Sequence, residues 1–324
     1  MFQPRTRREF LTEAGRWTGS TLLAAGSMGR LSEALPPSTL PRRRLGRTGV
    51  EVSILGMGLA PLGLANYPPD HFRTVVRAAL DEGVSYFDVQ PDYGEAEKHL
   101  SRLLKEHRAR RFVATKTSEQ SKEAVLDSIA GSVRRLGTPR VDAVLLNNIG
   151  DYDLQKLFRA DGALAGLREA RRRGQVRFLG LSGHWRPGHF VKALESGEFD
   201  IAMAPFNLVD RHTYSFERDI LPVAARFDVG VIAMKVLGGA VGLAYDTPRQ
   251  KAMLPEGHHR LAIRYVLGLP HVSCAVVGMK NAEEIRLAAR VARDDRALSE
   301  TEQASALALG RKLAAEWGAH YPEG

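Results

Sequence analysis

Short apolar runs that alternate with helical patterns constrain this 324-residue chain more than any other feature. Eight runs are rich in Val, Ile, Leu and Ala and lack a strict polar alternation, which is typical of strands covered on both faces of a parallel sheet. They lie at residues 54–58, 84–89, 111–115, 141–147, 176–182, 200–206, 229–235 and 272–277. Eight strand–helix units in series predict an α/β fold of the (β/α)8 TIM barrel type.

The segments between these runs carry apolar residues at helical spacing. We expect Asp70 to cap the first helix and Gly83 to end it. Further helices are expected at residues 96–107, 122–136, 163–173, 187–196, 217–227, 259–267 and 283–291. A last helix should begin at Ser299, where Ser299 and Glu302 form a capping-box pattern, and continue to about Trp317.

The chain before the first run divides into three parts. Residues 43–45 and 50–53 flank Gly46-Arg-Thr-Gly49, which predicts a hairpin with glycines at its turn positions. Prolines at 36, 37 and 41 indicate a linker over residues 35–42. The barrel domain, with its C-terminal helix, is therefore expected over residues 43–324.

Residues 1–34 resemble a twin-arginine export signal. Arg7 and Arg8 precede an apolar stretch from Trp17 to Met28, and small residues up to Ala34 lead into the prolines. The alternative is a short amphipathic helix in which the arginine pair is incidental. The order of the three features favours the leader, which implies export of the folded protein by the twin-arginine machinery to a periplasmic or other extracytoplasmic location.

Composition narrows the classes of function. The formal net charge is +9, and the first 34 residues hold five Arg and three Glu, which leaves +7 for the rest. The basic residues are spread over many helices without an aromatic–basic cluster, so we expect no nucleic-acid partner. The sequence contains no run of 18 apolar residues, so we expect no membrane span. Cys274 is the single cysteine, and no ligand spacing predicts a metal site.

A tyrosine, a lysine and an aspartate fall at the ends of two consecutive predicted strands. Asp88 lies near the end of the run at 84–89, Tyr93 lies in the loop beyond it, and Lys116 directly follows the run at 111–115. Adjacent parallel strands place all three at one rim of the barrel. A tyrosine has a pKa of about 10, and a nearby ammonium is expected to lower it, so that Tyr93 donates a proton to a nascent alkoxide. Asp88 would hold and compensate Lys116.

The pattern Phe-Asp-x-x-x-x-Tyr-Gly, followed by a lysine at the next strand end, resembles the aldo/keto reductase family. Residues 44–53 resemble the hairpin that closes the bottom of that family's barrel, and the likeness extends to about Val291. The resemblance implies hydride transfer with Asp88, Tyr93 and Lys116 as catalytic residues. The family's histidine at the end of the fourth strand is Asn147 here, which donates a hydrogen bond but moves no proton.

The resemblance also implies contacts to a nicotinamide ring. Ser182 matches the serine that binds the carboxamide, and Asn207 is retained after the sixth strand. Met234 replaces the aromatic residue that stacks on the ring; it could pack there or belong to the barrel core. Lys235 ends the seventh strand, where a cofactor phosphate or a substrate carboxylate would satisfy a buried ammonium. His184 and His212 follow strands five and six, so each is a plausible substrate contact.

Two further segments are expected to hold the cofactor phosphates. The long loop at 237–257 begins with Leu237, Gly238 and Gly239 and includes Gly242, and its glycines would let backbone amides approach the pyrophosphate. Gly278, Met279, Lys280 and Glu284 lie at a helix N-terminus after the eighth strand, where the family binds the adenosine 2′-phosphate. Lys280 and Arg286 favour a phosphate there, whereas Glu284 opposes one.

Together these features predict an exported aldo/keto reductase-like enzyme. It would transfer hydride between NADP(H), with NAD(H) as the second choice, and a small carbonyl compound or alcohol. A nucleotide-binding sensor or partner protein with little catalysis is the main alternative, because the family histidine is missing. A cofactor-free barrel lyase or hydrolase would leave Ser182 and Lys235 without a nicotinamide ligand.

Overall fold

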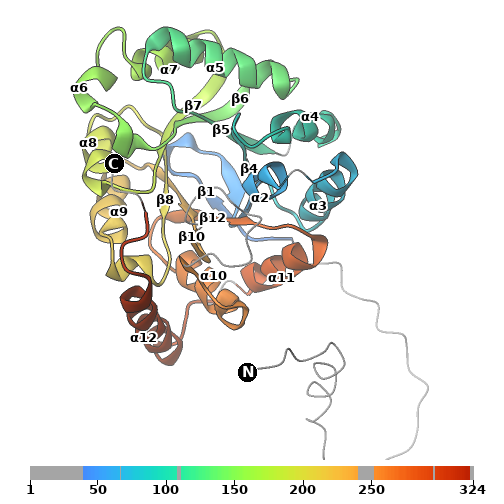
Figure 1. Ribbon diagram of the computed structural model, residues 1–324, viewed down its shortest axis with the longest axis vertical. Helices are drawn as coiled ribbons and strands as arrows, with labels where there is room; N and C mark the ends of the chain where they lie inside the picture. Colours follow the sequence, from blue (N-terminus) through green and yellow to red (C-terminus); the bar gives the residue numbers. More distant parts are fainter. Residues whose placement is uncertain (1–38, 66, 108–110, 240–251, 295, 322–324) are drawn as a thin grey trace, which may run out of the picture. The chain divides into compact units, whose positions relative to one another are not determined.

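The computed structural model describes residues 39–65, 67–107, 111–239, 252–294 and 296–321. Eight parallel strands close into a barrel in the order β12-β3-β4-β5-β6-β7-β8-β9, and helices form an outer layer around it (Figure 1). This confirms the predicted (β/α)8 fold. The strands span Leu55–Gly58 (β3), Tyr86–Asp88 (β4), Phe112–Thr117 (β5), Val141–Leu146 (β6), Val176–Ser182 (β7), Ile201–Pro205 (β8), Gly230–Met234 (β9) and Val272–Gly278 (β12).

The outer helices follow the strands in alternation. Their bounds are Ala60–Leu64 (α2), Pro69–Asp81 (α3), Ala96–His107 (α4), Lys122–Arg135 (α5), Leu154–Leu157 (α6), Ala163–Arg172 (α7), Pro187–Glu195 (α8), Phe216–Arg226 (α9), His259–Leu267 (α10), Ala282–Arg293 (α11) and Glu300–Trp317 (α12). Short 3-10 helices lie at Gly46–Thr48 (η1), Ile149–Asp151 (η3), Asp210–His212 (η4) and Glu256–His258 (η5). In the described part of the chain, no helix is long and apolar enough to cross a membrane.

The strands are buried on both faces, which explains their continuous apolar sequences. Along β4, Tyr86 belongs to the cluster inside the barrel, and the next residue, Phe87, packs in the layer between barrel and helices. The helices contribute one face each to that outer layer. In α3 the buried residues Phe72, Val75, Val76 and Ala79 recur at the spacing of a single helical face.

A hairpin closes the bottom of the barrel, as expected. Strands Arg42–Arg44 (β1) and Glu51–Ser53 (β2) pair antiparallel, with η1 between them. Leu45 is fully buried in the cluster inside the barrel. At Gly46, with φ +48°, an added Cβ would lie 2.2 Å from the backbone nitrogen of Gly230, at the start of β9. Only glycine permits this close approach of turn and strand.

Several predicted boundaries need correction. Asp70 is not the cap of α3: the helix begins at Pro69 and its N-cap is Pro68, because a proline fits the first helical turn. Arg42, assigned to the linker, already pairs in β1. The long seventh loop contains a two-stranded sheet, Gly238–Gly239 (β10) with Ala252–Met253 (β11). The capping box of Ser299 and Glu302 is confirmed at the start of α12. The predicted leader at residues 1–34 lies outside the described residues.

Candidate active site

A buried ion pair forms the centre of the site at the carboxyl end of the strands. Asp88 is the last residue of β4 and pairs in register with Ala114, two residues before Lys116 in β5. The Lys116 Nζ lies 2.6 and 2.5 Å from the two carboxylate oxygens of Asp88. Their side chains are 4% and 7% exposed, so each charge depends on the other for compensation.

Tyr93 lies above this pair, as predicted. Its hydroxyl is 3.4 Å from Lys116 Nζ, and the ammonium is 5.2 Å from the ring centroid. The turn that carries Tyr93 is held by backbone bonds to Gln90 and Ala96, and α2 packs against it. At Gly63 an added Cβ would lie 2.1 Å from the Tyr93 carbonyl oxygen, so a glycine is required for this packing. The structure therefore brings the predicted trio together.

The electrostatic state of Tyr93 differs from the expectation. Burial raises the pKa of Tyr93 well above its ordinary value, and the carboxylates of Asp88 and Asp92 raise it further. The expected lowering by Lys116 was wrong for this state, because Asp88 neutralises that ammonium at contact distance. Burial also raises the pKa of Asp88, although Lys116 acts against it. Tyr93 is thus a neutral phenol, the protonated form that a general acid requires.

Asn147 and Ser182 meet at the ends of two neighbouring strands. Asn147 follows β6, and its Nδ2 donates to Ser118 Oγ at 3.2 Å. The Ser182 hydroxyl, at the end of β7, lies 3.4 Å from Asn147 Oδ1 and 3.2 Å from the Leu146 carbonyl oxygen. The structure therefore places two residues predicted for the carbonyl and for the nicotinamide side by side.

His184, beyond β7, lies at the same carboxyl end of the barrel, which we call the mouth. Its Nδ1 is 3.1 Å from Asn148 Oδ1, and Asn148 adopts a left-handed backbone with φ 57°. Burial lowers the pKa of His184 well below its ordinary value, and the charges of Lys235 and Lys116 lower it further. The imidazole is therefore neutral. His212, the other histidine considered as a substrate contact, lies against Gly310 of α12 instead.

Asn207 and Met234 are engaged by the protein itself. The Asn207 side chain donates to Asp210 at 2.6 Å and to the Lys235 carbonyl at 3.1 Å, and it accepts from the backbone of Val209 and Asp210. Its contact to a nicotinamide thus stays a prediction. Met234 is 9% exposed and belongs to the cluster inside the barrel, which is the core alternative.

The residues expected at the phosphates lie at two edges of the mouth. Gly238 has φ 91° and is packed tightly, since an added Cβ would lie 2.4 Å from the Ala252 carbonyl oxygen. Leu237 is half-buried just before it, and Gly239 pairs with Ala252. Gly242 lies outside the described residues. Their contact with a pyrophosphate stays a prediction.

At the N-terminus of α11, the carboxylate of Glu284 occupies the position expected for the cofactor's 2′-phosphate. Glu284 accepts from the Lys280 backbone N–H at 2.7 Å and from the Asn281 side chain at 2.9 Å, and Asn281 caps the helix. Gly278 is exposed beside Pro61, and Met279 is buried. A phosphate at this end has to displace the Glu284 carboxylate.

The chain's last described residues complete the mouth, and no sequence pattern indicated them. The Tyr321 hydroxyl donates to Asp210 Oδ2 at 2.7 Å, and its ring lies 5.7 Å from that of His184. His320 lies 3.2 Å from Asp210 Oδ1. The backbone nitrogens of both residues donate to the Tyr214 hydroxyl. A polar latch of Asp210, Tyr214, His320 and Tyr321 thus fixes the end of the chain beside the site.

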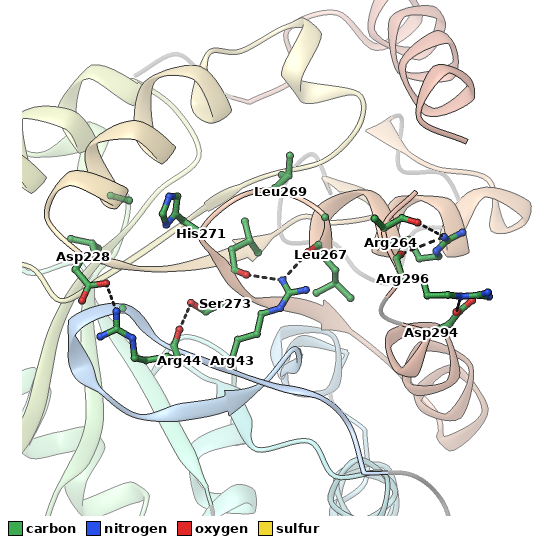
Figure 2. Close-up of a pocket in the computed structure, with 16 residues that line it drawn as sticks. Arg43, Arg44, Asp228, Arg264, Leu267, Leu269, His271, Ser273, Asp294 and Arg296 are labelled. Atoms are coloured by element: carbon green, nitrogen blue, oxygen red, sulfur yellow. Dashed lines mark hydrogen bonds and ion pairs between the residues drawn. The ribbon is translucent and has the colours of Figure 1, made fainter. Parts of the chain in front are cut away.

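A pocket of about 510 Å³ lies at the opposite end of the barrel from Asp88 and Lys116, beside the hairpin (Figure 2). Its arginines are engaged by the protein. Arg43 donates to the carbonyls of Leu267 and Val272, Arg44 pairs with Asp228, and Arg296 pairs with Asp294. Within the described ranges, no group of three or more His, Cys, Asp or Glu side chains is arranged to hold a metal ion.

Comparisons with known proteins agree with this geometry. The model of the aldo/keto reductase family matches residues 54–305. Pyridoxal 4-dehydrogenase of Microbacterium luteolum is 27% identical over an alignment 317 residues long. The alignment covers 76% of this chain and 91% of that protein. L-galactose dehydrogenase of Arabidopsis thaliana is 27% identical over 277 residues, covering 75% and 85%.

Solved structures share the fold. An aldo-keto reductase of Klebsiella pneumoniae in complex with NADPH aligns with a TM-score of 0.68 at 20% identity, covering 84% of this chain and 96% of that one. The family match extends over most of the chain and includes the strand ends that carry Asp88, Tyr93 and Lys116. The chain therefore belongs to the aldo/keto reductase family and is an NAD(P)H-dependent oxidoreductase.

Proposed function

We propose that the protein is an exported reductase that transfers hydride between NADP(H) and a small carbonyl compound or alcohol. The observation that carries this proposal is the neutral Tyr93 phenol above the buried Lys116–Asp88 pair. The Arg7-Arg8 leader supports a twin-arginine route to an extracytoplasmic location. The Klebsiella pneumoniae relative in complex with NADPH supports the choice of cofactor.

The residues present fit a nicotinamide cofactor at the mouth. Ser182 and Asn147 offer hydroxyl and amide groups there, which now bond to the Leu146 carbonyl and to Ser118 and lie 3.4 Å from each other. When bound, the cofactor supplies the hydride. Tyr93 would donate the proton to the oxygen of the reduced carbonyl, and Asn147 would orient that oxygen by a hydrogen bond. Lys116 Nζ, which lies 3.4 Å from the Tyr93 hydroxyl, would donate a hydrogen bond to the phenolate left on Tyr93.

A nucleotide-binding sensor of the same fold is the second candidate. The amide of Asn147 moves no proton, and the Glu284 carboxylate already fills the N-terminus of α11. Both features would slow turnover or weaken NADPH relative to NADH, while leaving a nucleotide site at the barrel mouth.

The test is a tryptophan-fluorescence titration of the protein with NADPH and then NADH, followed by turnover with a panel of aldehydes. Binding with oxidation of the bound nucleotide supports the reductase. Tight binding without turnover of any aldehyde favours the sensor. Absence of binding to either nucleotide, checked by calorimetry, contradicts both proposals. Export is tested separately, because replacing Arg7 and Arg8 by lysine should retain the protein in the cytoplasm.

A further inference from the structure

Lys235 is presented to the barrel mouth by a constrained backbone. It follows β9 directly and has φ 56°, in the left-handed region that strains a non-glycine residue. Its carbonyl oxygen accepts a hydrogen bond from Asn207 Nδ2 at 3.1 Å, which fixes this turn. The backbone from which the Lys235 side chain leaves the strand end is therefore fixed, and the residue is partly buried.

The other charges at the mouth are compensated within the protein. Lys116 is paired with Asp88 at 2.5 Å. Asp210 accepts hydrogen bonds from Asn207 and Tyr321 and faces His320. Among the described residues, no carboxylate lies within ion-pair distance of Lys235. Among the described residues, Lys235 is thus a cation without an ion-pair partner, although the charges of Asp210 and Asp88 act on it from beyond that distance.

The charge of Lys235 is electrostatically coupled to groups at the carboxyl ends of β4, β5 and β7. The charge of Lys235 lowers the pKa of His184 and acts against the raised pKa of Asp88. Burial and the charge of Lys116 lower the pKa of Lys235 itself to about 8. At neutral pH the amine is still largely protonated. An anion bound here would relieve the repulsion between Lys235 and Lys116.

We propose that Lys235 binds a carboxylate or similar anionic substituent of the substrate, so that the preferred substrates are acidic aldehydes or ketones. This inference rests on the proposed reductase function. An anionic group could also come from a cofactor phosphate, which shares the same chemistry. The two sources differ in whether loss of the ammonium weakens the substrate or the nucleotide.

The experiment compares 4-carboxybenzaldehyde with 4-formylbenzamide, its neutral isostere, at saturating NADPH. In the Lys235→Met variant, kcat/KM for the acid should fall roughly 10- to 100-fold more than kcat/KM for the amide, mainly through KM, because a charged hydrogen bond is lost. Lys235→Arg should restore part of the preference. Lys192→Met, on the exposed face of α8, controls for the change in net charge.

The pH dependence gives a second reading. KM for the acid should rise as the pH passes about 8, because the Lys235 ammonium is lost, and Lys235→Met should remove this rise. The same profile for the amide separates Lys235 from the other charged or titratable groups around it, which are Asp88, Lys116, His184, Asp210 and His320.

Two results overturn the inference. Equal losses for the acid and the amide mean that Lys235 acts in a step common to both substrates. A raised Kd for NADPH with an unchanged acid preference assigns Lys235 to a cofactor phosphate. Calorimetry with benzoate and benzamide needs no turnover, so it tests the anion site even if the protein reduces neither aldehyde. Selective loss of benzoate binding in Lys235→Met supports the site, and equal binding to both proteins contradicts it.

Discussion

The two ends of the barrel both carry clustered charges, yet they differ in how those charges are satisfied. At the bottom, beside the hairpin, Arg44 and Asp228 form a pair whose side chains are 59% and 50% exposed. At the mouth, Lys116 and Asp88 form a pair that is 4% and 7% exposed, and Lys235 has no carboxylate partner in the described part of the chain. Charged side chains that are solvated or paired with a neighbouring side chain have a structural role. A buried charged side chain without an ion-pair partner indicates a binding site for a ligand of opposite charge.

The presence of a pocket at the bottom end does not by itself indicate a ligand site. The bottom pocket is well formed, at about 510 Å³, and its arginines bind backbone carbonyls and neighbouring carboxylates (Figure 2). Arg264 there pairs with Glu302 at the start of α12, so the pocket walls are tied to one another. The residues at the bottom end therefore stabilise the fold, and the active site is expected at the mouth.

The largest expected difference between the ends concerns turnover. Tyr93→Phe removes the proton donor and should lower kcat by about 10²- to 10⁴-fold, with little change in the Kd of NADPH. Arg44→Met, at the bottom, should leave kcat within a factor of about two, since it lies outside the mouth. Steady-state kinetics with one aldehyde compare the two variants. Full kcat in Tyr93→Phe would remove Tyr93 from the mechanism.

Breaking the two ion pairs should have unequal effects on stability. Asp88→Asn leaves a buried ammonium without its counterion and should cost about 3–5 kcal/mol of unfolding free energy. Asp228→Asn breaks an exposed pair and should cost about 1 kcal/mol or less. Denaturant unfolding measures both. The uncompensated Lys116 should also lower the pKa of Tyr93, which phenolate absorbance detects against an Asp88→Asn, Tyr93→Phe control. Similar costs for the two pairs would contradict the comparison.

A glycine substitution tests whether the two ends are independent. Gly46→Ala drives a Cβ into the backbone of Gly230, at 2.2 Å, and should cost about 2–4 kcal/mol. Gly174→Ala has φ +72° and open space around it, so it measures the backbone cost alone, about 1–2 kcal/mol. Below the unfolding midpoint, Gly46→Ala should keep its kcat. A matching loss of kcat would show that the hairpin shapes the mouth.

The smallest expected effect is a pH dependence of stability from His184. Its folded pKa is depressed by burial and by the two lysines, so the unfolded chain binds the extra proton first. Stability is then present above the unfolded pKa, about 6.5, and falls below it by up to about 1.4 kcal/mol per pH unit. His184→Gln should remove this slope between pH 6.5 and 5. His271→Asn, an exposed residue at the bottom, is the control.

Local rules predicted the fold and the placement of three candidate catalytic residues. Continuous apolar runs with helical segments between them predicted the barrel, and the strand-end rule brought Asp88, Tyr93 and Lys116 together. The same rules did not predict the state of Tyr93, because its pKa depends first on its burial and then on the nearby carboxylates of Asp88 and Asp92. Burial and the distances between these charged groups depend on the three-dimensional packing.

Contacts between residues far apart in the sequence could not be predicted, for a different reason. Tyr321 binds Asp210, 111 residues earlier, and neither position carries a periodic or motif signal. Met234 was open between core and cofactor, since an apolar residue at a strand end satisfies both patterns. Its place in the inner cluster depends on the packing of several strands at once. The cap of α3 was misplaced because Asp70 and Pro69 both suit a first helical turn.

Closure of the barrel has a consequence for synthesis of the chain. β3 completes the barrel by pairing with β12, through Leu55 and Ala275. At ordinary ribosomal speeds of about 5–20 residues per second, the edge of β3 waits roughly 10–45 s for its partner. Until then a buried, apolar strand edge is open to pairing with other chains. Asp88 and Lys116 are made early, but the mouth that holds Lys235 exists only when the last strand arrives, so a stalled or truncated nascent chain is an aggregation hazard without a complete site.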